Sequence, residues 1–223
     1  MKQRIVILAG ATGLVGREIL QGLLADPSVS AVHSLGRRKP ETQRPKLTAH
    51  IVDFAALPPL PAADELYLAL GTTIKVAGSQ AAFRALDYDA NLNVAQAALA
   101  AGVKKVGLVS AMGADAGSRI FYNRVKGELE DTLTQLPFEG LVIARPSLLV
   151  GDRAVLGQPR RSGEMIGEAM ARVLGFLIPA DYKPIPASAV ARALLTAVPN
   201  ATARTVLPSG LMRQRSPAPP STA

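Results

Sequence analysis

Short apolar runs alternate along this chain with longer stretches in which apolar residues recur every three or four positions. The apolar runs, which we expect to form strands, lie at residues 4–10, 31–37, 48–54, 65–71, 104–111 and 139–146. The stretches of helical period lie at about 14–25, 79–101, 120–135, 163–175 and 187–197. Several runs lack polar alternation, which is typical of strands buried on both faces of a parallel sheet. The pattern therefore predicts an α/β doubly wound, mostly parallel sheet flanked by helices and joined by right-handed crossovers.

The length of the chain suits one good-sized domain. It has 223 residues, 48% of them hydrophobic, and it contains no internal repeat and no interdomain linker. We expect a single domain over residues 1–211, followed by a flexible tail at 212–223 that is poor in core-building residues. No apolar run reaches the roughly 18 residues of a membrane span, so we expect none.

Charge and cysteine content narrow the class of partner. The net charge is +8, with a local cluster at Arg37, Arg38 and Lys39, and this favours acidic or phosphorylated ligands. We find no zinc-finger spacing, basic zipper or aromatic RNA-binding motif, so we expect no nucleic-acid partner.

The chain has no cysteine, which excludes disulfides and thiolate metal sites and leads us to expect a cytoplasmic protein. His33 and His50 lie far apart in sequence, so we expect no metal site.

A glycine-rich turn follows the first predicted strand and opens the first predicted helix. Gly10, Gly13 and Gly16 give the pattern G-x-x-G-x-x-G in the context that nucleotide binding requires. Gly10 permits the tight turn, Gly13 lets the backbone approach a pyrophosphate, and Gly16 lets helix and strand pack closely. Free N–H groups at the start of the helix would face the anion. We expect a dinucleotide here; the alternative is a structural turn without a ligand.

The residues after the second predicted strand bear on which dinucleotide is bound. Proteins that prefer NAD usually place Asp or Glu there to hold the ribose hydroxyls. This chain has Arg37 and Arg38 instead, with no acidic residue before Glu41. A guanidinium can hold a 2′-phosphate through two hydrogen bonds, whereas a carboxylate would repel it. We therefore expect NADP(H) to be preferred over NAD(H); the alternative is an exposed basic loop.

Three polar residues lie at the end of the fifth predicted strand and on the helix that follows it. Ser110 lies at its end, and Tyr122 and Lys126 lie four residues apart on the next helix. Ligands of open α/β sheets bind outside the carboxyl ends of the strands, which is where Ser110 lies. A carbonyl that accepts hydride needs a proton donor at its developing oxyanion, and a phenol that a nearby ammonium makes more acidic can be that donor. The serine hydroxyl would position the substrate oxygen; the alternative is an ordinary solvated helix face.

Together these segments carry a family resemblance. The stretches "GATGLVG" and "YNRVK", with Ser110 between them, resemble the atypical branch of the short-chain dehydrogenase/reductase superfamily. "LALGTT", "LVSAMGAD", "YNRVKGELE" and "ARPSLLVGDR" resemble its Tat-interacting-protein-like group of NADPH-binding proteins. The resemblance covers about residues 4 to 176, and it implies a Rossmann fold, NADP(H) and a Ser–Tyr–Lys site at Ser110, Tyr122 and Lys126. The cofactor contacts that it implies, with those of the glycine turn, are Gly10, Thr12, Gly13, Leu14, Val15, Gly16, Arg37, Arg38, Asp53, Leu70, Gly71, Lys126, Pro146 and Leu148.

The chain departs from the family pattern beside the serine. Related proteins often have a second Ser or Thr there, and this chain has Ala111. Either Ser110 acts alone, or its hydroxyl points away and catalysis is weak. An asparagine that many related enzymes use cannot be assigned; Asn91 and Asn93 are the nearby options.

Three functions are compatible with these residues. The first is an NADPH-dependent reductase of a small carbonyl compound. The second is a regulatory protein that binds NADP(H) as a sensor with little or no turnover. The third is a sugar-nucleotide epimerase, for which the chain after "ARPSLLVG" leaves little room for a substrate domain. Residues 151–186 are the expected substrate lid, and Arg153, Arg160 and Arg161 within it favour an anionic substrate.

Overall fold

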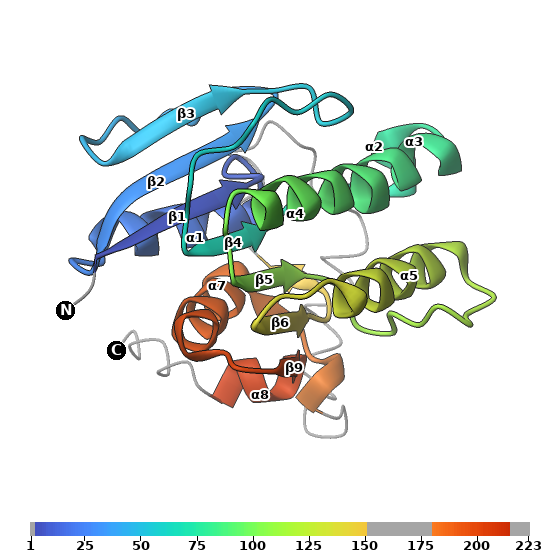
Figure 1. The fold of residues 1–223 in the computed structure, drawn as a ribbon. Coiled ribbons are helices and arrows are strands. Elements are labelled where there is room, and N and C mark those ends of the chain that lie inside the picture. Colours follow the sequence, from blue (N-terminus) through green and yellow to red (C-terminus); the bar gives the residue numbers. More distant parts are fainter. Residues whose placement is uncertain (1–2, 151–179, 215–223) are drawn as a thin grey trace.

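The computed structural model describes residues 3–150 and 180–214. The strands of its main sheet are β1 (Arg4–Ala9), β2 (Val29–Gly36), β3 (Leu47–Ile51), β4 (Glu65–Leu68), β5 (Lys105–Val109), β6 (Gly140–Arg145) and β9 (Arg204–Pro208). These seven strands lie in the order β3-β2-β1-β4-β5-β6-β9, and every neighbouring pair is parallel (Figure 1). All their carboxyl ends therefore meet at one edge of the sheet. A separate parallel pair joins β7 (Leu149–Val150) to β8 (Ile185–Pro186).

The helices of the described residues cover both faces of this sheet. They are α1 (Leu14–Ala25), α2 (Ile74–Ala77), α3 (Gln80–Arg84), α4 (Ala90–Ala100), α5 (Phe121–Gln135), α7 (Ala187–Ala197) and α8 (Ser209–Gln214), with a π-helix at Ala85–Asp89 and short 3-10 helices at Ala180–Tyr182 and Val198–Asn200. Helices α1 and α7 pack on one face, and α4 and α5 pack on the other. None of these helices is long and apolar enough to span a membrane.

Each central strand supplies side chains to both hydrophobic cores. In β1, Val6 and Leu8 pack in the core with α1 and α7, whereas Ile7 and Ala9 pack in the core with α4 and α5. All four are fully buried, because successive side chains of a strand point to opposite faces and both faces are covered. This explains why the apolar runs of the sequence show no polar alternation.

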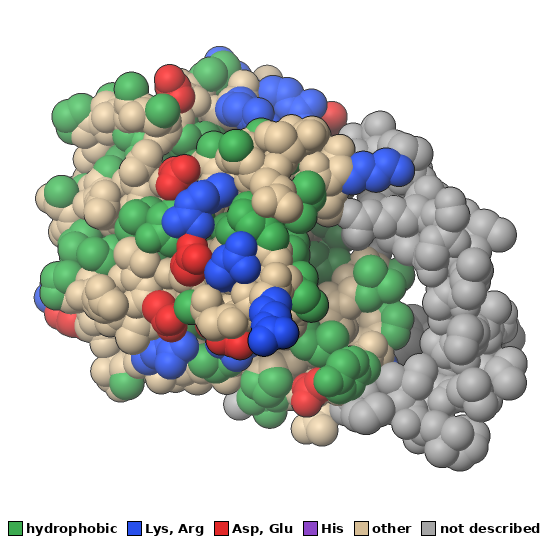
Figure 2. Space-filling model, turned by 90° about the vertical axis from the view of Figure 1, so that its right-hand side faces the viewer, with side chains coloured by type: hydrophobic (Ala, Val, Ile, Leu, Met, Phe, Trp, Pro, Cys, Tyr) green, Lys and Arg blue, Asp and Glu red, His purple; other side chains and the backbone are tan. Residues whose placement is uncertain are grey.

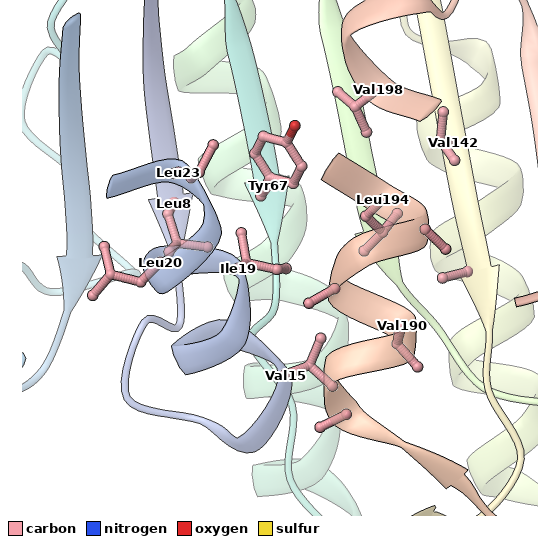
Figure 3. Close-up of a cluster of buried hydrophobic side chains, with 14 of the residues drawn as sticks. Leu8, Val15, Ile19, Leu20, Leu23, Tyr67, Val142, Val190, Leu194 and Val198 are labelled. Atoms are coloured by element: carbon pink, nitrogen blue, oxygen red, sulfur yellow. The ribbon is translucent and has the colours of Figure 1, made fainter. Parts of the chain in front are cut away.

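The core under α1 and α7 is built from small and medium aliphatic side chains (Figure 3). Val15 and Ile19 of α1 and Leu194 of α7 point toward the strands, with the ring of Tyr67 between the two helices. Helices α1 and α7 approach closely at Gly22, where an added Cβ would lie 2.3 Å from Leu195 Cδ1. The Leu195 side chain thus fills the space that the missing Cβ of Gly22 leaves between the two helices.

The elements expected from the sequence are present wherever the structure describes them. The predicted helices 14–25 and 187–197 match α1 and α7, and all six predicted strands form. The predicted helix 79–101 is interrupted at its centre by the π-helix. The predicted helix 163–175 and most of the expected lid, residues 151–179, lie outside the described residues. The expected tail begins too early, because α8 continues to Gln214 and Met212 is buried against the core.

Candidate active site

The glycine turn is shaped by close backbone contacts. Gly10 has a φ of +93°, and an added Cβ would lie 2.5 Å from the Ala69 carbonyl oxygen. A Cβ on Gly16 would lie 2.0 Å from the Gly10 carbonyl oxygen, so only glycine lets α1 pack against the end of β1. Gly13 is different, since a Cβ there would meet nothing nearer than 3.4 Å. The absent side chain at Gly13 therefore leaves space outside the fold, where a ligand could approach.

The first turn of α1 fits an anion. Gly13 is its N-cap, and within the described residues no side chain caps the helix there. Beside the turn lies a cleft of about 450 Å³, lined by Ala11 and Thr12 and by the cationic side chains of Arg17, Arg38 and Lys39. Backbone N–H groups at a helix start and nearby cations together favour phosphate groups. Of the two arginines expected at this position, Arg38 lines the cleft and Arg37 does not; Arg17 was not expected from the sequence.

The remaining predicted cofactor residues lie along the same edge of the sheet. Leu70 and Gly71 follow β4, and Asp53 follows β3, where its carboxylate accepts the Ala55 N–H. Pro146 is buried after β6, and Leu148 is 42% exposed. Figure 2 looks onto this edge and shows Lys and Arg side chains distributed among Asp and Glu. The sheet thus brings residues that are distant in sequence to one edge, and their contact with a cofactor stays a prediction.

Helix α5 carries the predicted tyrosine and lysine. Tyr122 is half-buried, and its ring lies 5.3 Å from that of Phe83. Lys126 is buried, and its Nζ lies 2.6 Å from Oδ1 of Asp87, which is fully buried in the π-helix. Asp87 Oδ2 also accepts the Thr72 N–H at 2.9 Å. Asp87 was not predicted from the sequence, because nothing in a helical stretch marks one acidic residue as the partner of a lysine far along the chain.

Burial and charge act in opposite directions on this ion pair. Burial alone lowers the pKa of Lys126, but attraction from Asp87 and the proximity of Tyr122 and Glu130 outweigh it, so the pKa is raised. Burial raises the pKa of the Asp87 carboxyl, and Lys126 and the Thr72 N–H oppose this without cancelling it. An ammonium at this position therefore stays protonated at neutral pH.

Ser110 has a partner that the sequence did not indicate. Its hydroxyl donates to Oε1 of Glu130 at 2.5 Å, and Glu130 is fully buried. Arg145 of β6 also donates to Glu130, through Nη2 at 2.6 Å. Because an ionised carboxylate only accepts hydrogen bonds, the serine proton is directed at Glu130. The Ser110 oxygen can then face a ligand only as an acceptor.

The two histidines, far apart in sequence, are neighbours in the structure. His33 Nδ1 and His50 Nε2 lie 3.0 Å apart, on the adjacent strands β2 and β3. Burial and, secondarily, His50 lower the pKa of His33. Among the described residues, no group of three or more His, Asp or Glu side chains is placed to hold a metal ion.

No family model matches the chain. Curated proteins that share one name are similar to it over most of its length, as two of them illustrate. It is 37% identical over 182 residues to "Protein fmp52, mitochondrial" of Emericella nidulans, which is 76% of each chain. It is 34% identical over 203 residues to "Protein FMP52, mitochondrial" of Candida albicans, which is 83% of each chain.

These relatives correct one expectation. The cytoplasmic location expected from the sequence is wrong, since both relatives are named mitochondrial proteins. The physical reason is that a lack of cysteine excludes disulfides but does not distinguish one compartment from another.

Solved structures confirm the fold class. An oxidoreductase of the short-chain dehydrogenase/reductase family from Burkholderia thailandensis superposes with a TM-score of 0.64 at 17% identity, over 96% of this chain and 94% of that one. A short-chain dehydrogenase family protein from Francisella tularensis gives 0.67 at 10% identity, over 95% and 100%. MoeE5 in complex with UDP-glucose and NAD gives 0.65 at 16% identity, over 91% and 75%. The chain therefore has the parallel doubly wound fold that is found in these proteins.

Proposed function

This chain belongs to the family of the FMP52 proteins, and from this premise we propose that it is an NADPH-dependent oxidoreductase that reduces a carbonyl group of a small molecule. The observation that carries the proposal is the placement of a cationic cleft, a glycine turn and a Tyr–Lys pair along one edge of the sheet. Solved structures with this fold include two short-chain dehydrogenase family proteins and a complex of MoeE5 with NAD. The stretches "LVSAMGAD" and "YNRVKGELE" support membership of the Tat-interacting-protein-like group as part of the same proposal.

The residues that would hold the cofactor lie along this edge. The N–H groups at the start of α1, next to Gly13, would bind the pyrophosphate, and Arg17, Arg38 and Lys39 would face the 2′-phosphate in the cleft. Three cations in one cleft favour NADPH over NADH, although Glu41 also lines it. The other cofactor contacts implied by the sequence, including Asp53, Leu70, Pro146 and Leu148, stay part of the proposal.

The chemistry divides between the cofactor and the chain. When bound, NADPH supplies the hydride. Tyr122 would donate the proton from its phenol to the substrate oxygen as negative charge develops there. Lys126, held as an ammonium by Asp87, would stabilise the phenolate that remains and bind the nicotinamide ribose.

Ser110 has a reduced role in this proposal. Its hydroxyl proton is donated to Glu130, and Ala111 offers no second hydroxyl. We therefore assign the proton-donating role to Tyr122 alone and give Ser110 the place of a substrate neighbour that anchors β5 to α5.

This arrangement also favours a second candidate function. A site in which one hydroxyl does the work of two suits a protein that binds NADP(H) as a regulatory ligand with little turnover. The epimerase alternative is less well supported, since the short-chain dehydrogenase chains are matched over 94% and 100% of their length and the UDP-glucose-binding MoeE5 over 75%.

The decisive experiment is the substitution Tyr122→Phe. Carbonyl compounds, anionic ones included, are screened for NADPH oxidation with the wild type and the variant. Loss of a general acid should lower kcat by about 100-fold or more while leaving NADPH affinity nearly unchanged. Tyr88→Phe is the matched control, because the Tyr88 hydroxyl contacts Thr132 and not the proposed site. Tight NADPH binding without turnover on any substrate would favour the sensor, and no NADPH binding would overturn both functions.

A further inference from the structure

A buried ion pair lies directly behind the proposed site. The Lys126 side chain is 5% exposed and that of Asp87 is 0% exposed, and their charged atoms are 2.6 Å apart. Burying two charges costs several kcal/mol per ion in typical proteins, and a well-packed apolar pair of similar volume is often as stable. A contribution to stability therefore does not explain why an ion pair is buried at this position.

The backbone around Asp87 departs from regular helix. Residues Ala85–Asp89 form a π-helix between α3 and α4. The Asn91 amide donates to the Leu86 carbonyl at 3.3 Å and to the Asp87 carbonyl at 3.1 Å. It thereby gives two backbone carbonyls of the π-helix a side-chain donor. Such π-helical turns are rare and occur often at functional sites. Here the turn, stabilised by Asn91, carries the carboxylate that meets Lys126.

The ion pair also borders the end of β4. A Cβ built on Gly71 would lie 3.5 Å from Asp87 Oδ1 and 3.7 Å from Lys126 Nζ. Thr72, the next residue, donates its N–H to the same carboxylate at 2.9 Å. Asp87 therefore links three segments: the π-helix that carries it, the strand end where the cofactor is expected, and the helix that carries Tyr122. Within residues 3–150 and 180–214, the other titratable groups that act on Lys126 are Tyr122 and Glu130, both on α5.

We propose that Asp87 is a positioning residue that keeps Lys126 charged and fixed at the end of β4, so that the ammonium meets the nicotinamide half of the cofactor. The inference rests on the proposed function. Without the carboxylate, a buried ammonium has no counter-charge, and the protein would release its proton or move the side chain. In either event the donor that the cofactor ribose needs is lost.

The test compares two ligands that share the adenine half. NADPH reaches both the cleft and Lys126, whereas adenosine 2′-phosphate 5′-diphosphate can reach only the cleft and the glycine turn. For Asp87→Asn we expect NADPH affinity at pH 8 to fall by at least about tenfold, the value of one hydrogen bond to a charged group. The affinity for the fragment should stay within about twofold. Both are measured by calorimetry or fluorescence, so no turnover is required.

A pH series distinguishes this role from a purely structural one, because a loss of stability alone would not make the ratio of the two affinities depend on pH. In the wild type the raised pKa of Lys126 keeps it charged, so the ratio of NADPH to fragment affinity should not change between pH 8 and 9.5. In Asp87→Asn burial acts with less opposition and the pKa of Lys126 falls, so the ratio should decrease as pH rises. The 2′-phosphate titrates in both ligands, and the terminal 5′-phosphate that only the fragment carries is fully ionised throughout this pH range.

Two variants serve as controls. Glu65→Gln breaks another buried pair, in which Glu65 Oε1 lies 2.6 Å from Arg4 Nη1 where β4 begins, at the opposite end of the strand from the site. It should lower stability without changing either affinity. Asp87→Glu retains the charge and is used if Asp87→Asn does not fold; it should weaken NADPH binding without introducing a pH dependence.

The outcomes separate the two proposals. If the wild type binds neither ligand, the proposed function fails. If the wild type binds both, and Asp87→Asn binds NADPH normally with a constant ratio across pH, the proposed function survives and the role of Asp87 is overturned. Equal loss of both ligands would likewise overturn it in favour of a general effect on the fold.

Discussion

Helix α5 carries two buried charged residues of opposite sign, one turn apart. Lys126 pairs with Asp87, and Glu130 accepts from Ser110 and Arg145. Both side chains leave the helix on its buried face and reach different partners, so they fasten α5 to the end of β5, to β6 and to the π-helix at once. The position of Tyr122 on the same helix depends on these contacts.

We expect Glu130→Ala to lower the free energy of unfolding by on the order of 3 kcal/mol. The substitution leaves Arg145 and the buried Ser110 hydroxyl without their acceptor. Glu128 is the matched control on the same helix, because its partner Arg84 is 40% exposed. Glu128→Ala should cost no more than about 1 kcal/mol. Urea unfolding of the two variants is the measurement, and equal losses would contradict the role given to Glu130.

At the scale of elements, the β1–turn–α1 unit has one glycine that packing requires and another that packing does not require. Gly16 is required by the fold, because its missing Cβ leaves room for the Gly10 carbonyl. Gly13 is not required for packing, and its φ of −77° suits any residue. Packing therefore explains Gly16, whereas the proposed approach of a ligand explains Gly13.

Substitution of each glycine by alanine should show this difference. Gly16→Ala should lower the free energy of unfolding by at least about 2 kcal/mol, since a Cβ 2.0 Å from backbone forces α1 away from β1. Gly13→Ala should cost less than about 1 kcal/mol, yet weaken NADPH binding by about tenfold or more where the methyl group meets the pyrophosphate. Thermal unfolding and nucleotide titration measure the two effects. A stable Gly16→Ala protein would show that the turn has more freedom than its contacts indicate.

At the scale of the whole molecule, the parallel sheet brings the segments of the proposed site together. The glycine turn follows β1, the cationic loop follows β2, Gly71 follows β4 and Ser110 follows β5, and these strand ends are neighbours only in the folded state. A dinucleotide bound across them would join segments that unfold together. Its binding energy would then add to the stability of the entire fold.

NADPH at 100 times its dissociation constant should raise the free energy of unfolding by about 2.7 kcal/mol. For a protein of this size that corresponds to roughly 5–10 °C in Tm. NADH at the same concentration should raise Tm less. Arg38→Ala should remove most of this difference, whereas Arg37→Ala should remove little, because only Arg38 lines the cleft. Equal effects of the two arginines, or equal shifts with NADPH and NADH, would contradict the assignment of the 2′-phosphate site.

The sequence alone determined the features that depend on local order along the chain. Period and apolar runs predicted α1, α7 and all six strands that were expected, since a strand or helix is specified by its own neighbours. The glycine turn was also predictable, because its three glycines lie within one short segment that performs its function locally.

Only the tertiary structure decided which distant side chains meet. Asp87 with Lys126, Ser110 with Glu130, and His33 with His50 are pairs joined by the strand order and by the packing of α5 against the π-helix. No periodicity encodes such pairs, because each depends on where the sheet places two segments that lie far apart in the sequence. The same cause explains why Arg17 was missed and why Arg37 and Arg38 could not be told apart until the cleft was seen.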